Sequence, residues 1–108
     1  MNIVEYKGTN PNVVYTVTLD PGRSVTVERK DSGTTVAMRT FEPGDVAEYD
    51  SFNLRYTAPI KSISAKTITF DLRHGKTKRL NPEQFAWRNW DFDAEQVRIE
   101  NSETMNYI

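Results

Sequence analysis

Residues 66–72, with the sequence KTITFDL, alternate between apolar and polar side chains. Ile68, Phe70 and Leu72 fall on one face, and threonines occupy most of the other face. A period of two that includes β-branched residues is typical of a strand with one buried face. This stretch therefore predicts a strand of an antiparallel sheet, and the chain on either side of it repeats the pattern.

Alternating residues earlier in the chain predict three strands joined by tight turns, which form an antiparallel β-meander over residues 12–39. The pairs Pro21-Gly22 and Ser32-Gly33 mark its turns, since proline presets φ and glycine accepts positive φ. Barrel-like strands over residues 44–80 bring the total to about seven. Pro59 within one of them predicts an edge strand or a β-bulge, because proline has no N–H to donate to a sheet.

The spacing of apolar residues also predicts the register of the hairpin that follows residue 72. A two-residue loop would place Leu80 on the face opposite to Phe70, since a slip of one residue reverses every side chain. We therefore predict a three-residue loop over residues 74–76, which sets Phe70 opposite Leu80.

Helix signals appear only after residue 80. Residues 81–84, NPEQ, combine an asparagine N-cap, a proline at the first helical position and a glutamine that completes a capping box. They predict a short helix over residues 82–88. A second helix is expected over residues 93–107, because one of its faces would hold Ala94, Val97, Asn101, Met105 and Ile108.

These elements predict the architecture of the whole chain. Its 108 residues are enough for one ordinary domain, which we expect over residues 1–108. The class is mainly β (α+β), a small antiparallel barrel or curved sheet of about seven strands. One short helix and a C-terminal helix would pack on it.

The composition excludes several classes of function. The chain has no cysteine, which excludes disulfides, thiolate zinc sites and a cysteine nucleophile, and its single histidine lies in a predicted turn. Asp91, Asp93 and Glu95 lie close together, but acids at the start of a helix explain this cluster without a metal ion. No apolar run reaches the roughly 20 residues of a membrane-spanning helix, and the first residues are not a signal peptide. We therefore expect a cytoplasmic protein without enzymatic activity, metal or cofactor.

Charge is distributed unevenly along a chain whose formal net charge is only -1. Residues 55–88 carry eight basic and two acidic side chains, whereas the segments 41–54 and 89–108 each have a net charge of -4. Basic groups bind phosphate and aromatic rings stack on unpaired bases, so this stretch predicts a surface for nucleic acid or an acidic partner. The residues expected to form it are Arg73, Lys76, Lys78, Arg79, Arg88 and Trp90.

A structural interpretation of the same residues stays open. Phe85, Trp87 and Phe92 can form core where the helices meet the sheet, with cationic side chains over the aromatic faces. The basic hairpin would then be a solvated loop, paired with acids of residues 41–54 or 89–108.

A second candidate surface is the aromatic loop over residues 49–56. It is rich in residue types that are favoured at protein interfaces. An inward-folded loop is the structural alternative. The residues expected to contact a partner are Tyr49, Phe52, Asn53, Arg55 and Tyr56.

Several short blocks stand out in the second part of the chain: GDVAEYD at 44–50, IKSI at 60–63, KTIT at 66–69, RL at 79–80 and FAWRNW at 85–90. Together they resemble small, uncharacterised proteins that bacteriophages and other mobile elements of bacteria encode, with an SH3-like barrel. The likeness covers about residues 40–108.

This resemblance implies a setting rather than a set of catalytic residues. Small phage proteins often bind and block a host machine, as anti-CRISPR and anti-restriction proteins do. The expected function is therefore a non-catalytic protein that inhibits a bacterial defence complex through protein–protein contact in the cytoplasm of the host cell. The alternative is a small nucleic-acid-binding β-barrel module that uses the basic hairpin and neighbouring aromatic residues.

Overall fold

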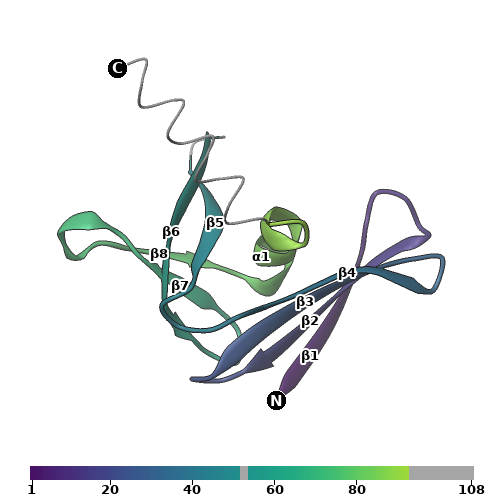
Figure 1. Ribbon diagram of the computed structural model, residues 1–108, viewed down its shortest axis with the longest axis horizontal. Helices are drawn as coiled ribbons and strands as arrows, with labels where there is room; N and C mark the ends of the chain where they lie inside the picture. The colour runs from purple at the N-terminus through teal and green to yellow at the C-terminus, as the bar shows by residue number, and fades with distance from the viewer. Residues whose placement is uncertain (52–53, 93–108) are drawn as a thin grey trace.

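A computed structural model of the chain describes residues 1–51 and 54–92. These residues form eight strands and one α-helix, which confirms the mainly β class with one short helix. The strands form two four-stranded antiparallel sheets rather than one sheet of about seven strands, and each sheet keeps its strands in chain order. The helix lies where the two sheets meet (Figure 1).

The elements have the following bounds. The first sheet consists of β1 (Asn2–Lys7), β2 (Val13–Asp20), β3 (Ser24–Asp31) and β4 (Thr34–Phe41). The second sheet consists of β5 (Val46–Ser51), β6 (Leu54–Ile63), β7 (Ile68–Asp71) and β8 (Thr77–Leu80). The helix α1 (Pro82–Asn89) follows β8.

The predicted meander corresponds to β2, β3 and β4. β1 is not among the predicted strands, and the alternation of apolar and polar residues in it is confined to residues 4–7. β1 pairs with β2 through contacts such as Val4 opposite Val17. The apolar positions of the period-two pattern along β2 and β3 are buried, as predicted: Val13, Tyr15, Val17, Leu19, Val25 and Val27.

Pro59 lies in β6, which is not an edge strand over its whole length, but β7 pairs with β6 only from Ile60 onwards, so Pro59 lies at a local edge among the described strands. It pairs with Val46 of β5. The predicted β-bulge is confirmed. The pairing of β6 with β7 shifts in register between Ile60 and Ser62, which is the signature of a β-bulge.

The loop between β7 and β8 has the predicted length but begins one residue earlier than predicted. The Leu72 N–H donates a hydrogen bond to the Lys76 carbonyl (2.8 Å), so the loop is residues 73–75 and the predicted 74–76 is wrong. Gly75 occupies the third loop position with φ of 71°. His74, in the middle of the loop, is also left-handed, with φ of 61°. Glycine adopts a positive φ without steric cost, which favours Gly75 inside the loop.

The corrected register changes the pairing but not the face. Leu80 pairs with Ile68 rather than with Phe70, and Phe70 pairs with Lys78. The two registers differ by two residues, so Leu80 stays on the face that holds Phe70. The side chains of Leu80, Ile68 and Phe70 are all buried there.

The helix α1 begins where the sequence predicts it. Asn81 Oδ1 accepts a hydrogen bond from the Gln84 N–H (2.8 Å), and Gln84 Oε1 accepts one from the Asn81 N–H (3.1 Å), which completes the capping box. Pro82 occupies the first helical position, and the helix ends at Asn89. The helix predicted over residues 93–107 lies outside the described residues.

We expect Asn81→Ala to lower the free energy of unfolding by about 1 kcal/mol, because the Gln84 N–H loses its acceptor at the start of α1. Urea unfolding followed by circular dichroism measures this change. Asn81→Ser is the matched control, since a serine oxygen can still cap the helix. Equal losses in the two variants would contradict a capping role for Asn81.

The core is one buried cluster that joins the two sheets through α1. Phe85 of α1 is fully buried, and its ring lies 5.2 Å from Phe41 of β4 in an edge-to-face contact and 6.2 Å from Phe70 of β7. Phe92 packs on Phe41 with ring centroids 5.9 Å apart. The helix contacts β2 and β3 of the first sheet and β5 and β8 of the second, so it determines how the sheets sit together.

Candidate functional site

The outer edge of β5 is closed by α1. Asn89 lies fully buried at the end of α1, and its side chain makes three hydrogen bonds. Its Oδ1 accepts from the Glu48 N–H (2.8 Å), while its Nδ2 donates to the Glu48 carbonyl (3.0 Å) and to the Phe85 carbonyl (3.0 Å). The amide thus pairs with Glu48 as a neighbouring strand would.

On its side away from β5, the first part of β6 has no strand partner among the described residues. β6 has 10 residues and its neighbour β7 only 4, and their pairing ends at Ile60 and Phe70. The preceding residue of β6 is Pro59, which has no N–H to continue the ladder. The part of β6 from Leu54 to Pro59 therefore has β5 on one side and, among the described residues, no strand on the other.

The direction of the backbone groups in this part of β6 follows from alternation. The Ile60 N–H donates to the Asp45 carbonyl and the Ile60 carbonyl accepts from the Gly44 N–H, both at 2.8 Å, so Ile60 points towards the β5 side. Successive residues of an antiparallel strand point their N–H and C=O groups to opposite sides. Arg55 and Thr57 therefore point theirs to the open side.

The bonds of Asn89 give the same assignment independently. Glu48 pairs with Thr57 across β5 and β6, and the Glu48 backbone groups point to Asn89, away from β6. When the backbone N–H and C=O groups of one residue in an antiparallel pair point away from the partner strand, those of the paired residue do the same. The Thr57 N–H and C=O consequently face away from β5.

A groove of about 540 Å³ occupies this open side. Its two walls are β6 and the connection between β7 and β8. It brings together side chains from the two surfaces that the sequence predicts separately. The residues that line the groove are Tyr49, Tyr56, Thr57, Ala58, Pro59, Asp71, Leu72, Arg73, His74 and Lys76.

The aromatic part of the groove is a stacked pair. Tyr49 and Tyr56 lie opposite each other on β5 and β6, with ring centroids 5.6 Å apart and an interplanar angle of 25°. Tyr49 also packs on the buried Phe70 at 5.3 Å, which fixes the pair to the core. Tyr56 keeps 43% of its surface exposed, so its ring is available for contact.

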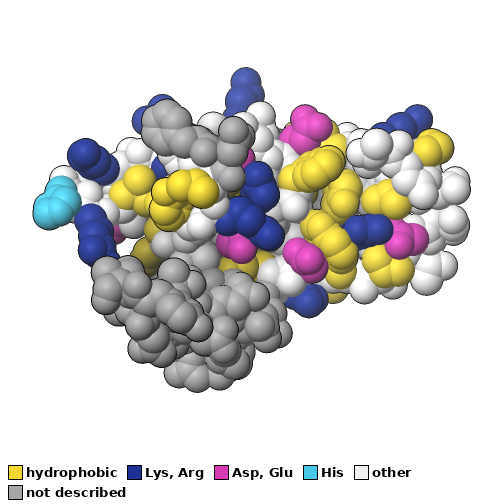
Figure 2. Space-filling model, turned by 90° about the horizontal axis from the view of Figure 1, so that it is seen from above, with side chains coloured by type: hydrophobic (Ala, Val, Ile, Leu, Met, Phe, Trp, Pro, Cys, Tyr) yellow, Lys and Arg dark blue, Asp and Glu magenta, His cyan; other side chains and the backbone are white. Residues whose placement is uncertain are grey.

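The polar part of the groove is mainly basic. Arg73, His74 and Lys76 are exposed, and none of them forms an ion pair with another described residue. Asp71 is the single acid among the described lining residues. Figure 2 shows the histidine, in cyan, at one end of the molecule with Lys and Arg side chains beside it.

Four predicted site residues, Tyr49, Tyr56, Arg73 and Lys76, thus share one groove. Lys78 pairs with Phe70 and Arg79 with Thr69, so these two basic side chains point to opposite faces of the second sheet, and neither lines the groove. The sequence does not predict the other six lining residues, which are Thr57, Ala58, Pro59, Asp71, Leu72 and His74. Pro59 in the middle of a strand is nevertheless a signal that pairing stops there.

Arg55 and Arg88 do not contribute to the groove, because each pairs with an acid of β5. The Arg55 Nη2 lies 2.8 Å from Glu48 Oε2, and the Arg88 Nη2 lies 3.2 Å from Asp50 Oδ2. Neither arginine belongs to the basic hairpin. Its residues Arg73, Lys76, Lys78 and Arg79 form no ion pair with a described acid, so the predicted pairing of the hairpin with acids is not seen among the described residues. The predicted contact residues 52–53 lie outside the described residues.

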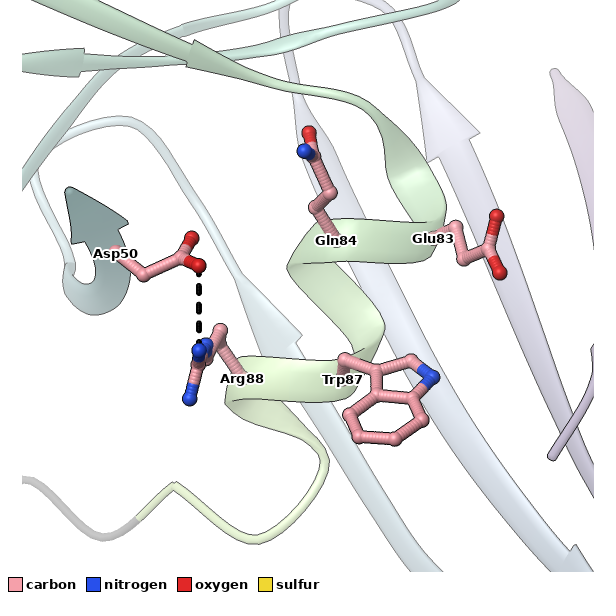
Figure 3. Close-up of a pocket in the computed structure, with 5 residues that line it drawn as sticks. All are labelled: Asp50, Glu83, Gln84, Trp87 and Arg88. Carbon is pink, nitrogen blue, oxygen red and sulfur yellow. Dashed lines mark hydrogen bonds and ion pairs between the residues drawn. The ribbon is translucent and has the colours of Figure 1, made fainter. Parts of the chain in front are cut away.

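A smaller pocket of about 240 Å³ lies beside α1 (Figure 3). The Arg88–Asp50 ion pair forms one side of it, and Trp87 lies on the other with 54% of its surface exposed. Trp87 is therefore a surface residue, whereas Phe85 and Phe92 are core. The residues that line this pocket are Asp50, Glu83, Gln84, Trp87 and Arg88.

Trp90 contacts a cation of the first sheet and does not line the groove. The guanidinium carbon of Arg29 lies 4.2 Å from the Trp90 ring centroid and 5.9 Å from that of Tyr15. Arg29 Nε also donates to Asp31 Oδ1 (2.9 Å), and this hydrogen bond is the main reason why the pKa of Arg29 is raised. A cation over an aromatic face, as the structural interpretation expects, thus occurs at Trp90.

Comparison with protein-family models, with curated proteins and with solved structures finds no match. Within residues 1–51 and 54–92, no group of three His, Asp or Glu side chains is placed to hold a metal ion. In the same part of the chain, no helix is long and apolar enough to cross a membrane.

Proposed function

We propose that this chain is a non-catalytic binding domain that attaches to an acidic surface of a partner protein through the groove beside β6. The observation that carries the proposal is that Tyr56, Arg73 and Lys76 line one groove, although they come from elements far apart in the sequence. Tyrosine and arginine are enriched among the residues that contribute most to binding at interfaces. Cations that no described carboxylate neutralises would attract and orient an acidic partner.

The chemistry of the groove supports binding rather than catalysis. General acid–base catalysis usually needs paired carboxylates or a histidine oriented by a carboxylate. Among the described residues that line the groove, Asp71 and His74 are single examples of their kinds, and they form no ion pair with each other.

The partner that we propose is a component of a bacterial defence complex, which the chain would bind in the cytoplasm of the bacterial cell. This part of the proposal rests on the resemblance of residues 40–108 to proteins of phages and mobile elements. The order of β5 to β8, four consecutive antiparallel strands followed by a short helix, supports an SH3-like arrangement for this part of the chain.

Single-stranded nucleic acid is the second candidate ligand. The exposed ring of Tyr56 beside Arg73 and Lys76 favours it, because bases stack on aromatic side chains while cations contact phosphates. The formal net charge of -1 is unusual for such a protein. We therefore place protein binding first.

The test reverses the charge of the groove. We expect the double variant Arg73→Glu and Lys76→Glu to bind the partner roughly 30-fold more weakly, on the basis of about 1 kcal/mol for each reversal. The immobilised chain is incubated with a nuclease-treated bacterial lysate, and retained proteins are quantified by mass spectrometry.

The matched control reverses Lys7 and Lys66, which are exposed and lie outside the groove. It changes the net charge equally and should keep the partner. Equal retention by all three proteins would overturn the proposal. Retention that requires intact nucleic acid, and that falls steeply with salt, would favour the second candidate.

A further inference from the structure

We infer that the partner supplies an extended, acidic segment that adds as a strand to the open side of β6, beside Arg55–Pro59. This inference rests on the proposed function and specifies how its groove is occupied. An extended peptide can join an exposed sheet edge through main-chain hydrogen bonds, while pockets along the edge select its side chains.

The backbone of β6 carries the argument. The N–H and C=O groups of Arg55 and Thr57 point away from β5, and the pairing with β7 ends at Ile60. Unpaired groups in a row along a strand are a template for another extended chain. A nucleic acid has no backbone that alternates donors and acceptors in this way, so this feature favours a polypeptide.

The dimensions agree with a short added strand. The part of β6 from Leu54 to Pro59 is about 20 Å long at roughly 3.3 Å per residue. The connection after β7 forms the other wall of the groove, so the space beside β6 is open where a further strand would lie. The added segment would therefore span about six residues.

The side chains of the groove specify the chemistry of the segment. Tyr56 and Ala58 lie on one face of β6, since side chains alternate along a strand, so the added segment would place apolar residues on that face. The opposite wall carries two cations, Arg73 and Lys76, and one acid, Asp71. This excess of positive charge favours carboxylates at the remaining positions of the segment. An acidic segment with apolar residues at every second position fits both conditions.

The outer edges of β5 and β4 are less suited to this role. The outer edge of β5 is already paired with Asn89 at Glu48. Along β4, the register against β3 shifts so that Val36 is an extra residue, and β-bulges at an edge hinder the addition of a strand.

The experiment uses peptides as probes. A library of random decapeptides displayed on phage is selected on the full chain, and the tightest acid-rich peptide is synthesised. Amide hydrogen exchange is then measured by NMR with the peptide at about ten times its Kd. We expect exchange at Arg55 and Thr57 to slow about tenfold, because their N–H groups become hydrogen-bonded. The amides of Tyr56 and Ala58 already face β5 and should change little.

N-methylation of the peptide provides a test that leaves the protein unaltered. Methyl groups at every second residue should weaken binding about tenfold, while methyl groups at the intervening residues should have little effect, since only alternate N–H groups face β6. A protein variant adds a further test. Thr57→Pro removes an N–H that no described residue bonds and should weaken binding about tenfold more than Thr57→Ala does, because both variants change the side chain and only proline removes the N–H.

The outcomes separate this inference from the proposed function. In one outcome, the double variant Arg73→Glu and Lys76→Glu abolishes peptide binding, but the peptide does not slow amide exchange at Arg55 and Thr57. This outcome would overturn strand addition and keep the groove as the binding site. If no peptide binds the groove while a twelve-residue oligothymidylate does, both proposals are overturned. Period-two sensitivity to N-methylation together with slowed exchange would establish strand addition.

Discussion

Replacing Asn89 with leucine is expected to lower the free energy of unfolding by about 3 kcal/mol, although leucine is similar in size to asparagine. The Glu48 N–H and carbonyl would lose their partners and face an apolar side chain, and a buried backbone group left unpaired costs about 1–3 kcal/mol. Urea unfolding monitored by circular dichroism measures the loss. Because leucine leaves little empty space, the change reports the hydrogen bonds rather than a cavity.

Asn2→Leu is the control for the Asn89 substitution. Asn2 is exposed, and its side chain donates one hydrogen bond, to the Ala65 carbonyl at 3.0 Å. Substitutions at such surface sites usually change stability by no more than about 0.5 kcal/mol. If the Asn89 variant lost no more free energy of unfolding than the Asn2 variant, the hydrogen bonds of Asn89 would not be what holds α1 against β5.

Phe85→Ala is expected to have the largest effect on stability, a loss of about 4 kcal/mol. The ring is fully buried and contacts Phe41 in the first sheet and Phe70 in the second, so its removal leaves a cavity between the sheets. A loss of this size is a large fraction of the about 5–15 kcal/mol that stabilises an ordinary domain. Thermal unfolding followed by circular dichroism provides the measurement.

Trp87→Ala, on the same helix, is the matched control. It removes a larger aromatic side chain, but one with 54% of its surface exposed, and should cost less than about 1 kcal/mol. A loss at Trp87 as large as that at Phe85 would mean that the surface of α1, not its buried face, stabilises the fold.

Local signals in the sequence predict much of the fold. The capping box at residues 81–84 places the start of α1, because its hydrogen bonds involve only neighbouring residues. The alternation in β2, β3 and β7 predicts which side chains are buried. The hairpin loop is displaced by one residue because the prediction weighed the apolar residues and not the left-handed position that Gly75 fills.

The candidate site is less accessible to sequence reasoning. The groove exists because β6 is longer than β7, and relative strand length depends on pairing between distant residues. Nor does the sequence distinguish the basic residues that remain unpaired in the described structure, such as Arg73, from those that acids hold, such as Arg55 and Arg88. That distinction depends on which side chains face each other across β5, β6 and α1.

The order of the two sheets along the chain matters during synthesis on the ribosome. The first sheet is complete at Phe41, but α1, which contacts β2 and β3, begins only at Pro82. At about 5–20 residues per second, the intervening segment of about 40 residues takes about 2–8 s to translate. For that time the apolar residues of β2 and β3 that α1 contacts lack this cover, so we expect the nascent chain to be prone to aggregation until the helix leaves the exit tunnel.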